Sequence, residues 1–185
     1  MEETIVFGGG CFWCTEAVFL MLKGVVSVEP GYAGPEYKTS KGPGYEEVCT
    51  GATPYVEGAK VEYNPDEIAL EELLQVFFQS HDPTQLNGQG NDIGPQYRSV
   101  IFYTTLRQKE KSEHYIQVLG KGSIKPIVTT VEPLARFYKA EDYHQKYFAN
   151  HPYAGYCQLI IAPKVEKVQS KFKNLLKKKD DEGGV

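Results

Sequence analysis

The sequence lacks long apolar runs, is poor in cysteine and carries no excess of positive charge. Nothing in its 185 residues approaches the roughly 18 consecutive apolar residues of a membrane-spanning helix. The start, Met1-Glu2-Glu3, is acidic where a secretory signal peptide would be basic. With 24 acidic and 20 basic residues the net charge is −4, which offers no basic field to a nucleic-acid backbone. We therefore expect a cytoplasmic protein that binds neither membranes nor nucleic acids.

Cysteine is scarce but unevenly placed. The four cysteines are Cys11, Cys14, Cys49 and Cys157. They are too few for a disulfide scaffold in a chain of this length, and in a reducing cytosol they point to chemistry. The C-x-x-C formed by the first two has no second Cys or His pair at ligand spacing, so we expect no metal and no bound cofactor. The dispersed histidines are expected to be structural or exposed: His81, His114, His144 and His151.

The most informative segment is residues 8–14, which read Gly-Gly-Gly-Cys-Phe-Trp-Cys. It lies between the apolar run 4–7 and the helix-like stretch 15–23, so Cys11 is expected where a strand turns into a helix. The partial positive charge at a helix start lowers the pKa of a cysteine, which makes Cys11 a candidate nucleophile. Phe12 and Trp13 would supply aromatic walls for a small apolar group. The alternative is a buried cysteine in an aromatic core.

Strand and helix patterns alternate along what we expect to be a single domain. Strands are expected at Thr4–Phe7, Val25–Tyr32, Ala59–Tyr63, Ser99–Tyr103 and Ile127–Val131. The clearest helix repeats apolar residues at helical spacing from Leu70 to Phe78 and ends near His81. Further helices are expected at 105–119, 140–149 and Val165–Lys177. For the division of the domain, the C-terminal helix is assigned to 166–180 and a disordered tail to 181–185. This order is compatible with an α+β or an α/β fold.

Two long glycine-rich stretches, 31–51 and 82–98, are expected to be functional loops. Each contains tyrosines, and Tyr45 and Tyr97 are natural hydrogen-bond donors at the edge of a pocket near Cys11. Packing over the core with the hydroxyl in water is the alternative for both.

Several short motifs together resemble the A-type peptide-methionine sulfoxide reductases, which reduce the S-epimer of methionine sulfoxide. They are Gly-Cys-Phe-Trp at 10–13, Gly-Tyr-Ala-Gly at 31–34, Tyr-Glu-Glu-Val-Cys at 45–49, Val-Glu-Tyr-Asn-Pro at 61–65, His-Asp-Pro at 81–83, the run 90–99 and Gly-Tyr-Cys at 155–157. The blocks occur in family order and cover most of the chain to about residue 165. The resemblance implies an α+β two-layer sandwich of ferredoxin-like kind, with a largely antiparallel or mixed sheet and long coil segments.

The resemblance also assigns roles by position. Cys11 matches the nucleophile of the family, and Phe12 and Trp13 match the wall that holds the substrate methyl group. Glu57 stands where the family has its catalytic acid. Without the resemblance, this glutamate at a strand edge would be an ordinary surface residue.

Tyr45 and Tyr97 match the tyrosines that bind the sulfoxide oxygen, and Asp92 matches the acid that binds the substrate or its bridging water. The chemistry needs these residue types, because thiolate attack on a sulfoxide sulfur places negative charge on the oxygen. A buried, protonated carboxyl and phenolic donors stabilise and protonate that oxygen.

Release of methionine leaves a sulfenic acid on the nucleophile, which a second thiol removes. Cys157 resembles the resolving cysteine, and the Gly155 beside it suggests a flexible segment. A thioredoxin-like dithiol would reduce the resulting disulfide. The sequence departs from the family pattern at Cys14, often glycine there, which could resolve directly, relay or pack as a small apolar residue. Cys49 is expected to pack in the sheet.

The C-x-x-C supports a runner-up function, a general thiol-disulfide oxidoreductase that uses Cys11 and Cys14. Ten residues before the motif leave no room for the first βαβ unit of a thioredoxin-like protein. A binding module without turnover is a further alternative, against which a resolving thiol argues. The expected partners are oxidised methionine-containing proteins and peptides, together with thioredoxin.

Overall fold

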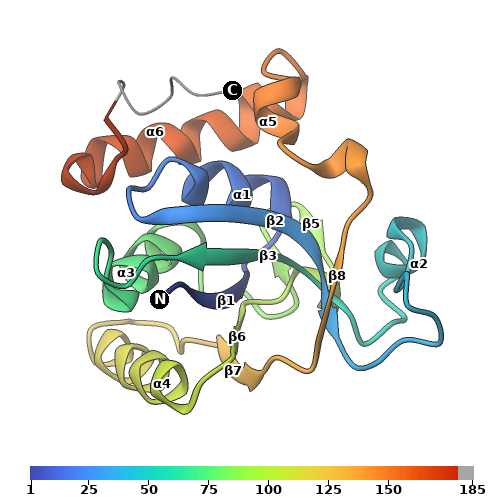
Figure 1. The fold of residues 1–185 in the computed structure, drawn as a ribbon, viewed down its shortest axis with the longest axis horizontal. Helices are drawn as coiled ribbons and strands as arrows, with labels where there is room; N and C mark the ends of the chain where they lie inside the picture. Colours follow the sequence, from blue (N-terminus) through green and yellow to red (C-terminus); the bar gives the residue numbers. More distant parts are fainter. Residues whose placement is uncertain (179–185) are drawn as a thin grey trace.

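A computed structural model describes residues 1–178 of the chain. Six strands form one curled, mixed sheet in the order β7-β6-β1-β3-β2-β8 (Figure 1). They are β1 (Glu3–Gly8), β2 (Val25–Gly34), β3 (Val56–Tyr63), β6 (Val100–Tyr103), β7 (Thr130–Pro133) and β8 (Arg136–Lys139). All neighbours are antiparallel except β6 and β7. A separate two-stranded ribbon pairs β4 (Gly88–Gln89) with β5 (Asp92–Ile93).

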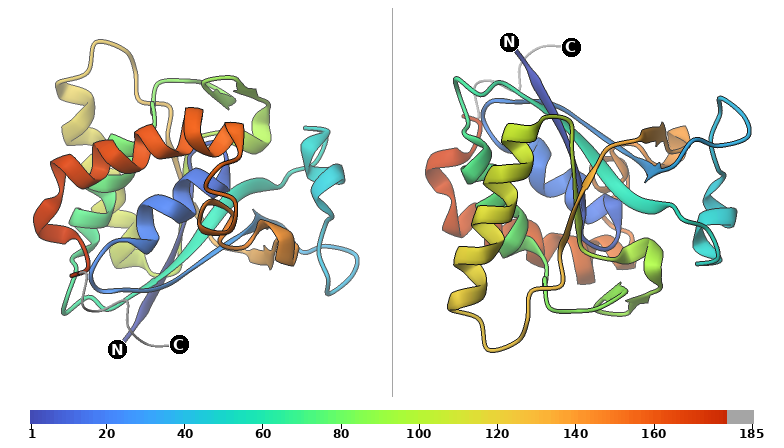
Figure 2. Two further views of the ribbon diagram at one scale, coloured as in Figure 1. Left: turned by 90° about the horizontal axis from the view of Figure 1, so that it is seen from above. Right: turned by 90° about the horizontal axis from the view of Figure 1, so that it is seen from below.

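Two helices, α1 (Phe12–Leu20) and α3 (Leu70–Ser80), pack on one face of this sheet, and α6 (Ala162–Lys171) lies over them (Figure 2). The strand period decides which residues meet them: Phe7 faces the helices and stacks on Phe19 and Phe77 with ring centroids 4.9 and 4.8 Å apart. Val6 points to the other face, into a smaller cluster with Phe102. The helix α4 (Leu106–Lys121) packs beside α3, the edge strand β7 and its neighbour β6.

Short helical segments lie between or after these elements. They are α2 (Tyr45–Cys49), η1 (Pro95–Tyr97), η2 (Asp142–His144), α5 (Tyr147–Asn150), the π-turn η3 (Cys157–Ile161) and η4 (Lys173–Leu175). Figure 2 shows α2 on a long loop that projects beyond the sheet. Among residues 1–178, no helix is both long and apolar enough to cross a membrane.

The strongest patterns in the sequence are confirmed. The helix predicted from Leu70 is α3, and the helix predicted over 105–119 is α4, with the Thr105 hydroxyl accepting from the Gln108 amide as its N-cap. The first four predicted strands are present. The fifth, expected at 127–131, lies at 130–133.

Two predicted helices are wrong in extent. The segment 140–149 does not form one helix, because Lys146 adopts a left-handed conformation with φ +51° between η2 and α5. The last helix begins at Ala162 and ends at Lys171, since Phe172 leaves helical geometry at φ −121° and ψ 38°. The tail predicted at 181–185 lies outside the described residues.

Candidate active site

Cys11 is the N-cap residue of α1, directly after β1, as the sequence predicts. Gly10 before it has φ +92°, and a β-carbon there would lie 2.7 Å from the Gln89 side chain, so this tight turn requires glycine. The amide of Cys14 donates to the Cys11 carbonyl at 3.1 Å and closes the first helical turn. The two thiols therefore lie at positions N-cap and N3 of the same helix.

Glu57 lies next to this turn, at the start of β3. It is only 2% exposed, and its Oε2 accepts a hydrogen bond from the Phe12 amide at 3.2 Å. Burial raises the pKa of Glu57 to about 8, with the charges of Asp92 and Cys14 adding to the effect and the Phe12 amide opposing it. At neutral pH this buried carboxyl is therefore mainly protonated and holds a proton beside Cys11.

The two thiols differ in their electrostatics. Burial raises the pKa of Cys11 well above its ordinary value, and its interaction with Cys14 and the charge of Glu57 raise it further. The pKa of Cys14 is lowered to about 7, first by its hydrogen bond with Cys11 and also by Lys164. The predicted lowering of the Cys11 pKa is therefore wrong, because desolvation of a thiol that is 7% exposed outweighs the partial charge of the helix start.

Phe12 and Trp13, the two residues between the cysteines, belong to an aromatic cluster. The Trp13 ring stacks on Tyr147 with centroids 3.7 Å apart and planes at 7°, and its indole N–H donates to His144 Nδ1 at 3.1 Å. The His144 ring lies 5.0 Å from Phe12 and 4.5 Å from Tyr45. Phe12 and Trp13 thus lie in one aromatic cluster with His144 and Tyr147, two residues to which the sequence assigns no role at the site. A buried Trp N–H needs a hydrogen-bond acceptor, but the sequence does not show which distant residue supplies it.

Tyr45 and Tyr97 come together near Glu57, from α2 and η1. Both phenols interact with the Cys49 thiol and with the charge of Glu57, and burial raises the pKa of each above its ordinary value. They therefore remain protonated donors at neutral pH. The sequence predicts Cys49 in the sheet, and this prediction is wrong. Cys49 lies at the end of α2, where its carbonyl accepts a hydrogen bond from Gln96 Nε2 at 3.2 Å.

Asp92 reaches the site from the β4–β5 ribbon. Its Oδ2 accepts a hydrogen bond from the Tyr156 hydroxyl at 3.0 Å, and Tyr156 in turn interacts with the Cys11 thiol. Tyr156 belongs to the Gly-Tyr-Cys motif at 155–157. From the sequence, only the cysteine of this motif is assigned a role.

Cys157 is fully buried in the π-turn η3, which packs against α1. The segment around Cys157, which the sequence predicts to be flexible, forms helical structure that continues into α6. Its pKa is raised by burial and by the charge of Cys14. All four cysteines are free, and among the described residues no group of three or more His, Cys, Asp or Glu could hold a metal ion.

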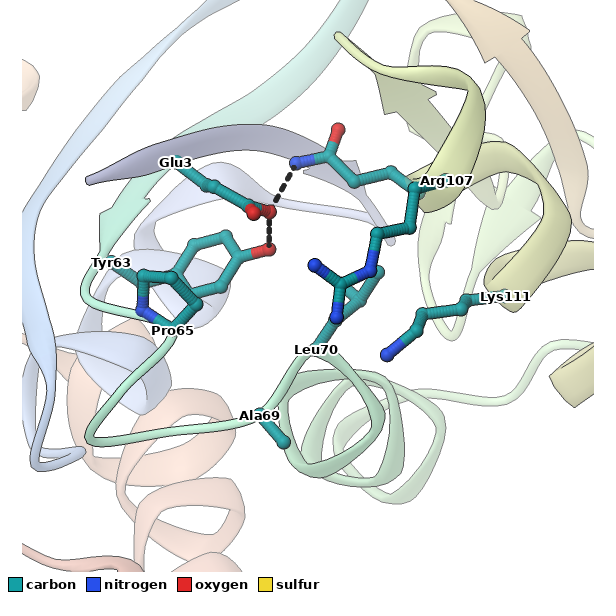
Figure 3. Close-up of a pocket in the computed structure, with 8 residues that line it drawn as sticks. Glu3, Tyr63, Pro65, Ala69, Leu70, Arg107 and Lys111 are labelled. Carbon is teal, nitrogen blue, oxygen red and sulfur yellow. Dashed lines mark hydrogen bonds between the residues drawn. The ribbon is translucent and has the colours of Figure 1, made fainter. Parts of the chain in front are cut away.

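A small cavity of about 60 Å³ lies at the other end of β1 (Figure 3). There Glu3 accepts hydrogen bonds from the Tyr63 hydroxyl at 2.6 Å and from Gln108 Nε2 at 3.4 Å, and Arg107 and Lys111 line the wall. This cavity contains no thiol and lies apart from the turn that holds Cys11 and Glu57.

Comparison with known proteins identifies the family of this chain. Residues 3–176 match the family described as Peptide methionine sulfoxide reductase. The chain belongs to this family. The Peptide methionine sulfoxide reductase MsrA of Picrophilus torridus is 47% identical over 173 residues, which are 93% of this chain and 96% of the relative. The chain is thus an oxidoreductase of methionine sulfoxide.

Solved structures show the same similarity. Mxr1 from Saccharomyces cerevisiae in reduced form has a TM-score of 0.78 at 35% identity, covering 84% of this chain and 89% of that chain. Mxr1 in complex with Trx2 has a TM-score of 0.53 at 26% identity, covering 79% and 84%. The fold is therefore that of methionine sulfoxide reductases.

Proposed function

We propose that this protein reduces the S-epimer of methionine sulfoxide, in proteins and as the free amino acid, with Cys11 as nucleophile and Glu57 as acid. The observation that carries the proposal is the buried carboxyl of Glu57, protonated at neutral pH and placed beside a thiol at a helix start. A nucleophile next to a proton donor is the pair that sulfoxide reduction needs.

In the first step the Cys11 sulfur bonds to the sulfoxide sulfur, and the thiol proton leaves to a neighbouring base. Glu57 gives its proton to the sulfoxide oxygen as negative charge develops there. Tyr45 and Tyr97 donate hydrogen bonds to the same oxygen, each worth roughly 10²-fold in rate. Overall, the Cys11 thiol and the sulfoxide are converted to a sulfenic acid on Cys11 and to the thioether of methionine.

The substrate methyl group lies against Phe12 and Trp13, and the stack of Trp13 on Tyr147 holds this wall rigid. Asp92, oriented by Tyr156, binds the substrate or a water that bridges to it. Three sides of the site thus differ in polarity, and this difference would select one epimer of the sulfoxide.

A second thiol then attacks the sulfenic acid and forms an intramolecular disulfide. Cys157 is the resolving cysteine that becomes part of this disulfide. A thioredoxin-type dithiol reduces that disulfide, which the complex of yeast Mxr1 with Trx2 supports. The four free thiols favour a cytoplasmic, reducing location and a role in repair of oxidised proteins.

We also assign residues 1–185 to one domain with a ferredoxin-like two-layer sandwich at its centre. The order β6-β1-β3-β2 of four antiparallel strands, with α1 and α3 as the crossover helices, supports the βαββαβ pattern.

The test is turnover of the separated epimers of a methionine sulfoxide peptide with dithiothreitol as reductant. Wild type should reduce the S-epimer and leave the R-epimer unchanged, and Cys11→Ser should reduce neither while keeping its fold by circular dichroism. Retained turnover in Cys11→Ser would overturn the catalytic assignment, and equal use of both epimers would overturn the stereochemical one.

A further inference from the structure

We propose that Glu141 is a positioning residue for sulfoxide reduction. Its carboxylate holds Tyr45 at the sulfoxide oxygen, and through His144 it holds Trp13 at the methyl group. The inference rests on the proposed function, because it takes the roles of Tyr45 and Trp13 from there. Glu141 has no part in the reaction itself and acts only through these neighbours.

Glu141 lies in a segment that is fixed to the sheet. The Ala140 amide donates a hydrogen bond to the Pro30 carbonyl of β2 at 2.9 Å, and Gln145 Nε2 donates to the same carbonyl at 3.1 Å. The Glu141 carboxylate also accepts from the hydroxyl of Tyr32, a fully buried residue of β2, at 2.8 Å. The sheet therefore places this carboxylate, which can serve as a fixed point for neighbouring segments.

The contact with Tyr45 is made where α2 begins. Tyr45 is the first residue of this helix, so its amide needs an acceptor from outside the helix. Gly44 before it has no side chain to supply one, and Glu141 Oε1, 96 residues away in the sequence, accepts this amide at 2.9 Å. Burial alone would raise the pKa of Glu141, but hydrogen bonds, above all from the Tyr45 amide, hold it below its ordinary value. The acceptor is therefore an ionised carboxylate at neutral pH.

This contact matters because α2 lies on a long loop that projects beyond the sheet (Figure 2). Loss of the acceptor would leave the start of the helix, and with it the Tyr45 ring, free to shift. A displacement of about 1 Å in a group that acts on the substrate costs about 10²-fold in rate. Glu141 is thus expected to control how well the Tyr45 hydroxyl meets the sulfoxide oxygen.

The second contact runs through His144, the last residue of η2, whose N-cap residue is Glu141. Burial lowers the pKa of His144, so its ring is neutral at pH 7. Its Nδ1 accepts from the indole N–H of Trp13 at 3.1 Å, and its hydrogen is therefore on Nε2. Among residues 1–178 this buried Nε2 has no hydrogen-bond partner, and the Glu141 carboxylate lies 3.9 Å from it. The negative charge of Glu141 favours this tautomer, which leaves Nδ1 free to accept from Trp13.

The two sides of the site meet at these residues. The His144 ring lies 4.5 Å from the ring of Tyr45, so the oxygen-binding and methyl-binding sides are in contact next to Glu141. Substitution of Glu141 should then change two quantities. One is the rate at saturating substrate, which depends on Tyr45, and the other is the substrate concentration at half-saturation, which depends on Trp13.

A double-mutant cycle with Tyr45 tests the first quantity, in single turnovers of an S-epimer methionine sulfoxide peptide with methionine measured after rapid quench. At saturating peptide, Glu141→Ala should lower the rate by about tenfold or more. In enzyme that carries Tyr45→Phe the same substitution should lower it by less than about twofold, because the hydroxyl that it positions is gone. Glu141→Gln should recover most of the rate, since its carbonyl can accept from the Tyr45 amide. Equal losses in both backgrounds, or a wild-type rate in Glu141→Ala, would overturn the role of Glu141 at Tyr45.

A second cycle tests the contact with Trp13. His144→Phe keeps an aromatic ring but removes the acceptor of the indole N–H, and it should raise the half-saturating peptide concentration by about fourfold, the effect of one methyl group left unburied. Glu141→Ala should give a similar rise, and the two substitutions together should raise it no further. An unchanged value in either single variant, or effects that multiply in the double variant, would overturn this part of the inference.

Glu29→Ala is the matched control. Glu29 lies on β2 and pairs with Lys60 at 2.8 Å, and its side chain is 29% exposed against 38% for Glu141. It should match wild type in both quantities, and urea unfolding of every variant shows which of them are folded. If Glu141→Ala does not fold, Glu141→Met, which keeps the length of the side chain without a carboxylate, takes its place in both cycles.

These outcomes are separate from those of the proposed function. If wild type releases no methionine from the S-epimer peptide, the proposed function itself fails. If wild type releases methionine and Glu141→Ala matches it in rate and in half-saturation, only the role of Glu141 fails.

Discussion

Replacement of Glu57 by glutamine tests the acid most sharply, because it keeps the shape and one hydrogen-bond donor but removes the transferable proton. In wild type, burial raises the pKa of Glu57 to about 8, so roughly nine-tenths of the enzyme carries the proton at pH 7 and about one-tenth at pH 9. We expect Glu57→Gln to lower the single-turnover rate of methionine formation by about 10²-fold at pH 7. The ratio of the two rates should shrink by about tenfold at pH 9, where wild type has lost the same proton.

The same substitution has a predicted effect on stability. The folded pKa of Glu57 is raised above the unfolded value of 4.5, so its contribution to stability is complete below pH 4.5 and is lost as pH rises through about 8. The full difference corresponds to about 5 kcal/mol as an upper limit. Glutamine does not ionise, so Glu57→Gln should gain stability relative to wild type between pH 5 and pH 9.

The assay for the rate is rapid quench of one turnover from pH 6 to pH 9, with methionine measured by chromatography. Because the charge of Glu57 raises the pKa of Cys11, the substitution also changes the ionisation of Cys11, so the alkylation rate of Cys11 is measured in both enzymes at each pH and used to correct the ratio. Urea unfolding at the same pH values measures the stability difference. A rate ratio near one, or a ratio that does not change with pH, would refute the assignment of Glu57 as the acid.

Three further predictions concern the side chains around this centre. Tyr45→Phe and Tyr97→Phe should each lower the single-turnover rate by about 10²-fold with little change in Cys11 alkylation, and a wild-type rate in both would remove the phenols from the reaction. Glu16→Gln should gain stability relative to wild type as pH rises from 5 to 8, because burial raises the pKa of Glu16 to about 7, and a pH-independent difference in urea unfolding would contradict this. Phe77→Ala should cost about 3 to 5 kcal/mol in urea unfolding, since its buried ring stacks on Phe7, and a loss below 1 kcal/mol would show that this core repacks easily.

The sequence predicts the parts of the fold whose patterns are local. The prediction of the helix from Leu70 is correct because apolar residues recur at helical spacing over a long stretch without proline or glycine. Cys11 is correctly placed because glycines mark the end of the first strand. The segment 140–149 fails because its break depends on Lys146, whose backbone amide donates to the buried Glu16 carboxylate at 2.6 Å. That partner lies 130 residues away in the sequence.

The candidate site divides in the same way. Phe12 and Trp13 could be named because they adjoin the cysteine, and Glu57 only because of the family resemblance. The sequence predicts that His144 is structural or exposed, like the other histidines. In the structure its ring lies against Trp13. The pKa values could not be predicted either, because they depend on the depth of burial and on charges from distant segments, which reversed the expected direction at Cys11.

The central claim is that the sulfur of Cys11 takes the oxygen of the substrate, and intact mass spectrometry after one turnover tests it most directly. The enzyme would carry both Cys14→Ser and Cys157→Ser, so that no resolving thiol competes, and would receive S-epimer peptide without reductant. The account predicts one methionine released per enzyme and one added oxygen atom that maps to Cys11 by its dione adduct. Methionine release with Cys11 unmodified, or an oxygen atom on Cys49 instead, would contradict it.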